Sequence, residues 1–208
     1  MKKFELTAEF VTNIFGKKLF RIKALVAFGD VEKGELGGFI EKEDNLSHLG
    51  DAWVSGNAWV YGDARVYGDA LVSGDARVSG DAWVSGNARV YGDALVSGNA
   101  LVSGDARVSG DAWVSGNARV SGNALVSGNA DYAVVTGFGR FFRTTTFFRC
   151  KDKILRVQCG CFYGDLAQFR EIVKKTHGNS KYAKEYLAIA DLMELHFSDE
   201  EENQEADE

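Results

Sequence analysis

The sequence contains no proline, although average usage of about 5% would place roughly ten in a chain of this length. Every residue therefore keeps its backbone N–H donor, so long hydrogen-bond ladders can run uninterrupted. Only three cysteines occur, Cys150, Cys159 and Cys161, which is unlike a secreted disulfide framework. The chain also has no apolar run long enough to span a membrane and does not start like a signal peptide. These absences predict a cytoplasmic protein with reduced thiols and no membrane contact.

Acidic residues are concentrated at the C-terminal end of the chain. The net charge is -6, but residues 199–208 carry seven acids and no base, which leaves 24 bases against 23 acids elsewhere. We expect residues 199–208 to be a solvated acidic tail. Residues 131–198, with eleven bases against seven acids, form the only basic part of the chain. Nucleic acid would be an electrostatically natural partner only for this part.

Glycine recurs every six residues from Gly50 to Gly128, and residues 50–127 form thirteen uninterrupted copies of Gly-[Asp/Asn]-Ala-x-Val-[Ser/Tyr]. Strand alternation places Ala and Val on one side and x and Ser/Tyr on the other. Gly-Asp and Gly-Asn favour turns, because glycine adopts positive φ at little cost. Two inward residues and a corner in each repeat predict a triangular coil of three repeats. Thirteen repeats then give slightly over four coils of a mainly β protein.

This repeat resembles the hexapeptide-repeat family, whose fold is a left-handed parallel β-helix. The segment that leads into it, FGDVEKGELGGFIEKEDNLSHLGDAWV at 28–54, is similar to that of enterobacterial hexapeptide proteins classed as acetyltransferases. It is closer still to phage- and prophage-encoded proteins that join this segment to long YGDARVSGDA-type runs. The part of the chain after the repeats resembles the C-terminal domain of the same phage-type proteins. The segments that carry this resemblance are TTTFFR, CGCFYGDLAQF, KKTHG and YAKEYLA.

The N-terminal flank, residues 1–49, is expected to be a β cap on the first coil. FELTAEF and LFRIKALVAF are strand-like runs separated by the turn-forming Gly16-Lys17. An open end of a repeat array exposes backbone groups and apolar side chains, so an atypical terminal unit is required. The apolar residues expected to plug the first coil are Leu36, Phe39, Ile40 and Leu46.

After the solenoid at 50–130, residues 131–198 are predicted to form a ββαα module. RTTTFFRC and ILRVQCG flank Lys151-Asp152-Lys153 and indicate a hairpin. Asp165 followed by Gln168 resembles a capping box that opens a helix ending near Gly178. Ser180 or Asn179 is expected to cap a second helix.

The period of three repeats predicts that outward residues 18 apart stack in rows. The rows are face one (Trp53, Leu71, Arg89, Arg107, Leu125), face two (Trp59, Arg77, Leu95, Trp113) and face three (Arg65, Trp83, Leu101, Arg119). Trp and Leu either cover the thin core, with Arg stacked on Trp, or form a protein interface. The interface candidates are Trp53, Trp59, Arg77, Trp83, Leu95 and Trp113. On face two, an antiparallel copy would set Trp59 near Trp113, so we expect a homodimer or, failing that, a trimer.

Residues that could carry chemistry are few. Hexapeptide acyltransferases use a histidine in a coil or its loop, but residues 49–176 contain none, and His48 reaches only one open end of the solenoid. We therefore predict no catalytic residue and no cofactor. An acyltransferase that uses CoA with His48 or His177 remains the alternative. Cys150, Cys159 and Cys161 with His177 would supply four zinc ligands, but their spacing favours buried reduced thiols, and we predict no metal.

Two charged patterns suggest further partners. Aromatic and basic residues alternate at 138–149, which suits single-stranded nucleic acid, and the candidates are Arg140, Arg143, Arg149, Lys151 and Lys153. Asp75, Asp93 and Asp111 should stack in a row that imitates nucleic-acid phosphates, collects cations or forms ordinary solvated turns. Together these features predict a non-enzymatic, phage-type scaffold that binds an unidentified host protein, such as a host defence or nucleic-acid enzyme that it inhibits.

Overall fold

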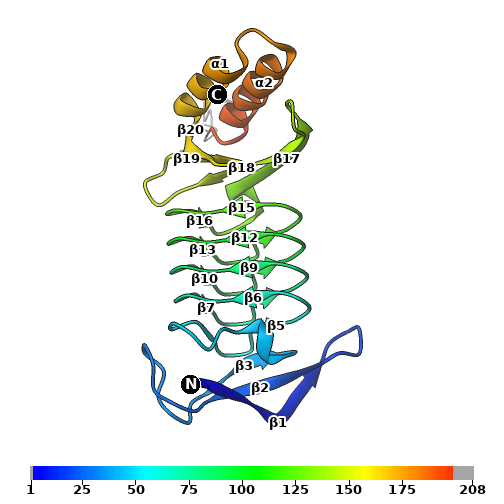
Figure 1. Ribbon diagram of the computed structural model, residues 1–208, viewed down its shortest axis with the longest axis vertical. Helices are drawn as coiled ribbons and strands as arrows, with labels where there is room; N and C mark the ends of the chain where they lie inside the picture. The colour runs from blue at the N-terminus through cyan, green and yellow to red at the C-terminus, as the bar shows by residue number, and fades with distance from the viewer. Residues whose placement is uncertain (1, 199–208) are drawn as a thin grey trace, which may run out of the picture.

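The computed structural model describes residues 2–198, which form an elongated molecule of three parts stacked along one axis (Figure 1). A regular β-solenoid lies between an N-terminal antiparallel β region and a C-terminal module of sheet and helices. This confirms the predicted mainly β fold. The predicted acidic tail, 199–208, lies outside the described residues.

Thirteen two-residue strands, each made of residue x and the following valine, build the regular part of the solenoid. Each strand pairs in parallel with the strand three positions along the chain, which gives three sheets, one for each predicted face. The strands are β4 (Trp53–Val54), β5 (Trp59–Val60), β6 (Arg65–Val66), β7 (Leu71–Val72), β8 (Arg77–Val78), β9 (Trp83–Val84), β10 (Arg89–Val90), β11 (Leu95–Val96), β12 (Leu101–Val102), β13 (Arg107–Val108), β14 (Trp113–Val114), β15 (Arg119–Val120) and β16 (Leu125–Val126).

Backbone hydrogen bonds join each coil to the next at a constant sequence interval. The Trp53 N–H donates to the Ala70 carbonyl at 3.0 Å, and the Arg107 N–H donates to the Ala124 carbonyl at 2.9 Å, each 17 residues ahead. Glycine is required at the corners: Gly86 has φ +65, and a Cβ there would lie 2.9 Å from the Gly104 nitrogen. The corner must therefore be glycine both for its backbone angle and for the close stacking of coils.

Within the repeats, the inward side chains that form the solenoid core are all small. Every repeat Ala and Val from Ala52 to Val126 is at most 1% exposed. This confirms the predicted inward positions in all thirteen repeats. Because each inward residue is small, a single coil buries little apolar surface, and the core depends on stacking.

The N-terminal region continues the solenoid as well as closing it. Strands β1 (Phe4–Thr12), β2 (Lys18–Ala24) and β3 (Leu36–Ile40) pair antiparallel, and β3 then pairs in parallel with β5. The sheet of face two therefore has seven strands. Together with the Leu46–Val66 bridge, β3 adds an irregular coil below the regular ones, for about five coils in total.

Two of the four residues predicted to plug the first coil do so: Ile40 and Leu46 join the solenoid core and are 2% exposed or less. Phe39 is 5% exposed, but it stands in register with the outward Trp59 and lies under Arg21, outside that core. Leu36 is 49% exposed, so the predictions for Phe39 and Leu36 were wrong. Leu36 begins β3 opposite Lys23, before the strand joins the solenoid. Its side chain therefore has no coil to pack against.

The C-terminal module has a four-stranded antiparallel sheet rather than the two strands predicted. The predicted hairpin forms β18 (Arg143–Arg149) and β19 (Leu155–Cys159). The additional strands are β17 (Tyr132–Phe138), which continues from the last coil through the short helix η2 (Asn129–Asp131), and β20 (Phe162–Asp165). The sequence did not predict β17, because it follows the end of the repeats without a turn-forming motif. It did not predict β20, because this strand is only four residues long.

Two helices cover the outer side of this sheet (Figure 1). Helix α1 (Leu166–His177) begins at the predicted capping box, and α2 (Lys181–His196) begins at Ser180. Alternate residues of β18 divide the sheet between two cores: Phe148 joins the solenoid core, and Phe147 packs with α1 and α2. The module is thus both the upper cap of the solenoid and a small core of its own.

Substitution in the middle coil tests the inward and outward assignment. Val90 is fully buried, whereas Ser97 is half-buried on an outward position. We expect Val90→Asp to lower stability by several kcal/mol, because it buries an unpaired charge, and Ser97→Asp to cost about 0.5 kcal/mol. Thermal unfolding of the two variants measures the difference. Equal melting temperatures would contradict the assignment.

Candidate functional site

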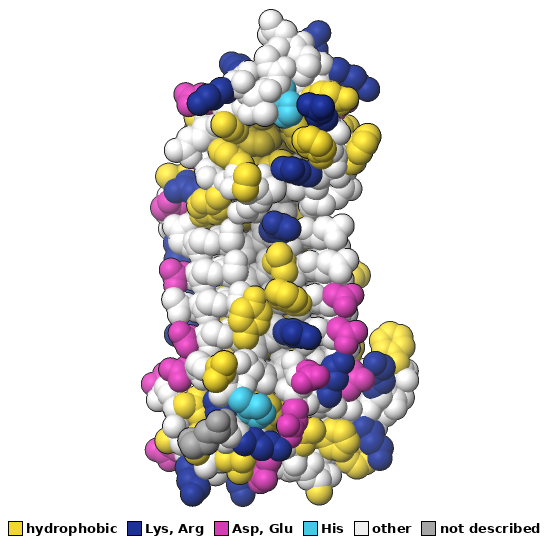
Figure 2. Space-filling view, viewed as in Figure 1, with side chains coloured by type: hydrophobic (Ala, Val, Ile, Leu, Met, Phe, Trp, Pro, Cys, Tyr) yellow, Lys and Arg dark blue, Asp and Glu magenta, His cyan; other side chains and the backbone are white. Residues whose placement is uncertain are grey.

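The outward residues lie in rows on three flat faces, and the residues that neighbour one another along each row are those predicted from the sequence. Strand register pairs Trp59 with Arg77 on face two, and Arg65 with Trp83 on face three. Figure 2 shows the face of β6, β9, β12 and β15, where a column of apolar and basic side chains runs between acidic edges. The Arg77 guanidinium lies 4.8 Å from the centre of the Trp59 ring, so this pair stacks as expected.

The interface candidates differ in their exposure to solvent. Trp83 is 43% and Trp113 is 54% exposed, whereas Trp59 and Leu95 are half-buried. Two contacts hold the exposed rings in place: Tyr67 lies edge-on to Trp83 at 5.9 Å, and Trp113 Nε1 donates to Ser97 Oγ at 3.2 Å. Trp83 and Trp113 are therefore large apolar surfaces at fixed positions.

Trp53 does not belong to this exposed set. It is 3% exposed and lies beneath Phe28, with the two ring centres 5.4 Å apart. The connection between β2 and β3, which carries Phe28, covers the first strand of face one. The prediction that Trp53 could anchor a partner was therefore wrong.

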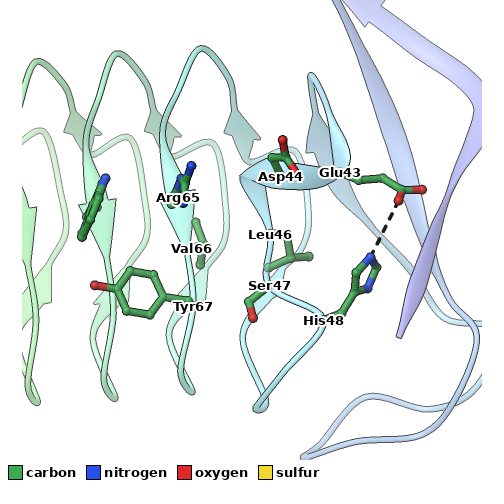
Figure 3. Close-up of a pocket in the computed structure, with 9 residues that line it drawn as sticks. Glu43, Asp44, Leu46, Ser47, His48, Arg65, Val66 and Tyr67 are labelled. Carbon is green, nitrogen blue, oxygen red and sulfur yellow. Dashed lines mark ion pairs between the residues drawn. The ribbon is translucent and has the colours of Figure 1, made fainter. Parts of the chain in front are cut away.

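The lower end of face three contains an open pocket of about 490 Å³. Arg65, Tyr67 and Trp83 of the solenoid form one side, and the segment from Glu43 to His48 forms the other (Figure 3). Sequence reasoning missed Tyr67 and Glu43 as lining residues. Tyr67 could have been found from the sequence, because a tyrosine stands there at the last position of the repeat, where most repeats have serine.

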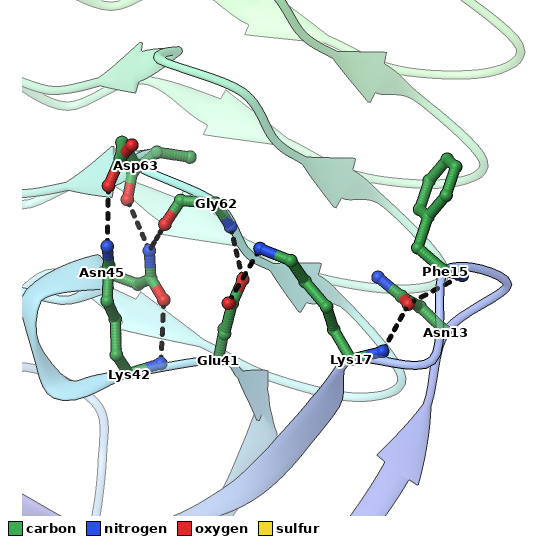
Figure 4. A network of polar contacts seen from close by, with 9 residues as sticks. Asn13, Phe15, Lys17, Glu41, Lys42, Asn45, Gly62 and Asp63 are labelled. Carbon is green, nitrogen blue, oxygen red and sulfur yellow. Dashed lines mark hydrogen bonds and ion pairs between the residues drawn. The ribbon is translucent and has the colours of Figure 1, made fainter.

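A buried asparagine holds the pocket's lower wall in place. Asn45 ends the short helix η1 (Glu43–Asn45), and its side-chain nitrogen donates to the carbonyls of Gly62 at 3.0 Å and Ala64 at 2.8 Å (Figure 4). Beside it, the Glu41 carboxylate accepts the Gly62 N–H at 2.7 Å. These side chains take the place of a further coil at this edge.

His48 accepts a hydrogen bond at one ring nitrogen and lies near a carboxylate at the other. Nδ1 accepts the Lys3 N–H at 3.2 Å, so Nε2 carries the proton, and it faces Glu43 Oε2 at 3.8 Å. The ring also stacks on Phe4 at 4.3 Å. A hydrogen bond from Lys2 holds the pKa of Glu43 below its usual range, so this carboxylate is ionised. In this arrangement His48 has no free lone pair to accept a substrate proton.

The structure separates the basic residues predicted to bind nucleic acid. Arg140 and Arg143 lie at one end of β18, and Lys151 and Lys153 follow its other end, about 20 Å away by strand rise. Arg149 is engaged by Asp131 at 3.7 Å and by the Phe197 carbonyl at 3.1 Å. Lys151 reaches down to the Asp105 carbonyl at 3.2 Å. The five residues do not form one continuous surface.

The three cysteines lie on opposite sides of the C-terminal sheet. Cys150 joins the solenoid core, where burial raises the pKa of its thiol to about 11. Cys159 packs towards the helices, and Cys161 is exposed. Within residues 2–198, no three His, Cys, Asp or Glu side chains form a group that could hold a metal ion.

Hydrogen bonds join the side chains of successive coils at several positions in the corner rows. Asn57 donates to Asp75 at 3.2 Å, and Asn87 donates to Asp105 at 3.0 Å, each across one coil. Each amide donates to the carboxylate one coil along but leaves its charge in place. In the row of Asp75, Asp93 and Asp111, no asparagine lies between the carboxylates.

The comparisons with known proteins concern the solenoid. A family model described as "YdcK Beta solenoid repeat" matches residues 58–74, 64–80, 70–86, 82–98, 88–104, 100–116 and 118–130. These matches agree with the stacked coils and cover neither flanking region. No curated protein matched the chain. Within residues 2–198, no helix combines the length and apolar character needed to cross a membrane.

Removing the buried amide beside the pocket tests how this edge is closed. Asn45→Ala leaves the Gly62 and Ala64 carbonyls without their partner, so we expect it to cost about 1–3 kcal/mol of unfolding free energy. The matched control is Asn57→Ala, which removes an exposed amide and should cost about 0.5 kcal/mol or less. Urea unfolding measures both. Equal losses would show that Asn45 does not close the edge.

Proposed function

We propose that the protein is a non-enzymatic scaffold that binds a protein partner through the exposed tryptophans of faces two and three. The observation that carries this proposal is the exposure of Trp83 and Trp113 on flat sheets whose backbone is fixed by the coil-to-coil ladder. Tryptophan beside arginine is typical of the residues that dominate binding energy in protein interfaces. A rigid platform also loses little conformational freedom when a partner binds.

The geometry around His48 favours this function over an acyltransferase. A general base needs a lone pair that can reach the substrate's proton. The His48 lone pair accepts a backbone N–H, and its ring proton faces Glu43. The inward side chains of the repeats are Ala and Val, which offer no nucleophile or acid.

The kind of partner follows from the family resemblance rather than from one residue. The leading segment at 28–54 and the C-terminal module both resemble those of phage-type proteins. We therefore propose a host protein as the partner, and inhibition of a host defence or nucleic-acid enzyme as the result. Trp83 and its neighbour Tyr67 would supply the apolar centre of the contact, with Arg65 and Arg119 along the same row.

Affinity capture with matched variants tests the proposal. We expect the unmodified chain to retain a host protein. Trp83→Ser or Trp113→Ser should each lower the affinity for that protein at least about tenfold, because each removes an exposed anchor. Tyr91→Ser is the control, because Tyr91 is an exposed aromatic residue outside the three rows. Mass spectrometry identifies the retained protein, and titration of the purified pair measures the loss. Equal affinity in all variants would contradict the proposal.

Calorimetry with acetyl-CoA separates the scaffold from the enzyme. The scaffold proposal predicts no saturable heat of binding. Micromolar binding that His48→Ala abolishes would overturn the scaffold proposal.

We also propose that face two mediates self-association when no foreign partner occupies Trp113. Within the regular coils its row places Trp59 and Trp113 at the two ends, so a copy related by a two-fold axis sets Trp59 near Trp113 and Arg77 near Leu95. Face one suits this less, because Arg89 and Arg107 are stacked neighbours and would meet like charges.

Light scattering at tens of micromolar tests this association. We expect a mass above the 22.7 kDa of one chain, which the double change Trp59→Ser/Trp113→Ser should reduce. Trp83→Ser on face three is the control and should leave the mass unchanged. A monomeric mass for the unmodified protein would remove this proposal and leave both tryptophans free for a foreign partner.

A further inference from the structure

The C-terminal module contains a cavity that is separate from the solenoid faces. It measures about 200 Å³ and lies between the end of the β17–β18 hairpin, the β19–β20 turn and the helices. Its wall is mainly aromatic and aliphatic, and the apolar lining residues are Phe141, Phe162, Phe169, Ile172 and Val173. Such a volume accepts an apolar group the size of one or two fused rings.

The charged groups that line this cavity are basic. Arg140 and Arg143 both line it, and their guanidinium groups lie 5.5 Å and 5.1 Å from the centre of the Phe141 ring. No Asp or Glu is among the described lining residues. Neither arginine forms an ion pair with a carboxylate of residues 2–198. An apolar wall with two arginines beside it is complementary to an apolar molecule that carries a negative charge.

The hairpin that carries these arginines is held against α2. The Gly139 N–H donates to Glu185 at 2.9 Å, and a Cβ at Gly139 would collide with the Tyr186 ring. Lys181 pairs with the same Glu185 at 3.5 Å, which further offsets its charge. The position of Arg140 therefore follows from a fixed contact between the hairpin and the helix.

We propose that this cavity binds a small apolar anion, an aromatic carboxylate, with its ring among the phenylalanines and its carboxylate on Arg140 and Arg143. The guanidinium group offers paired N–H donors that match a carboxylate, and both arginines are exposed, so these donors are open to a ligand. Burial of the ring supplies the remaining affinity. This site is independent of the partner-binding faces proposed above.

Calorimetric titration with 2-naphthoate and its neutral analogue 2-naphthamide tests the charge requirement. We expect saturable binding of one naphthoate per chain, and binding of the amide at least about tenfold weaker. Arg140→Gln/Arg143→Gln should weaken naphthoate binding at least about tenfold as well. Arg170→Gln is the control, because Arg170 pairs with Asp191 and Glu194 outside the cavity. No naphthoate binding at several millimolar, equal affinity for both compounds, or an unaffected double variant would overturn the proposal.

A cysteine at the cavity locates the bound probe. Cys161 is exposed and lines the cavity, whereas Cys150 is buried on the other side of the sheet. Saturating naphthoate should slow the alkylation of Cys161 by N-ethylmaleimide at least about threefold, and 2-naphthamide at the same concentration should slow it less. Peptide mass spectrometry follows the modified residue. An unchanged rate at saturation would place the naphthoate elsewhere and overturn the proposed site.

Discussion

The backbone ladder between successive coils is the interaction on which the rest of this structure depends. Each rung donates to a carbonyl 17 residues ahead, and the inward side chains are only Ala and Val, so no coil is stable without a neighbour. The ends must therefore be closed. Below, Asn45 and Lys3 donate to free carbonyls, and burial lowers the pKa of Lys3 to about 8. Above, Thr146 accepts the Arg119 N–H at 2.9 Å, and Tyr132 donates to the Trp113 carbonyl.

Closing the ends leaves the flat sides as the surfaces open to partners. The seven-stranded sheet of face two ends at β1, where a bulge between Leu6 and Phe10 disturbs further pairing. Outward positions contribute little to the core, so they are free to carry Trp83 and Trp113. The same division appears in the C-terminal module, where one side of β18 closes the solenoid and the other builds a separate core. The structure thus separates the residues that maintain the coils from those available for binding.

Periodicity made the repeat region predictable from the sequence. The fixed interval determines which residues point inward, which stack, and where glycine is needed, and Asp165 and Ser180 marked the helix starts by local capping chemistry. The burial of Trp53 was not predictable in this way, because it depends on where a non-repetitive connection folds. The pocket beside His48 and the cavity beside Arg140 likewise arise between segments distant in sequence. No local pattern encodes such contacts.

Hydrogen exchange of the backbone amides tests the central claim most directly, that a continuous ladder closed at both ends makes the solenoid one rigid unit. The account predicts that amides of the lowest and highest regular coils, at Trp53 and Arg119, exchange as slowly as those of the middle coil at Arg89. Protection that decreases steadily from the middle towards either end would contradict it. Such a gradient would show that the ends fray and that the flanking regions do not close the solenoid.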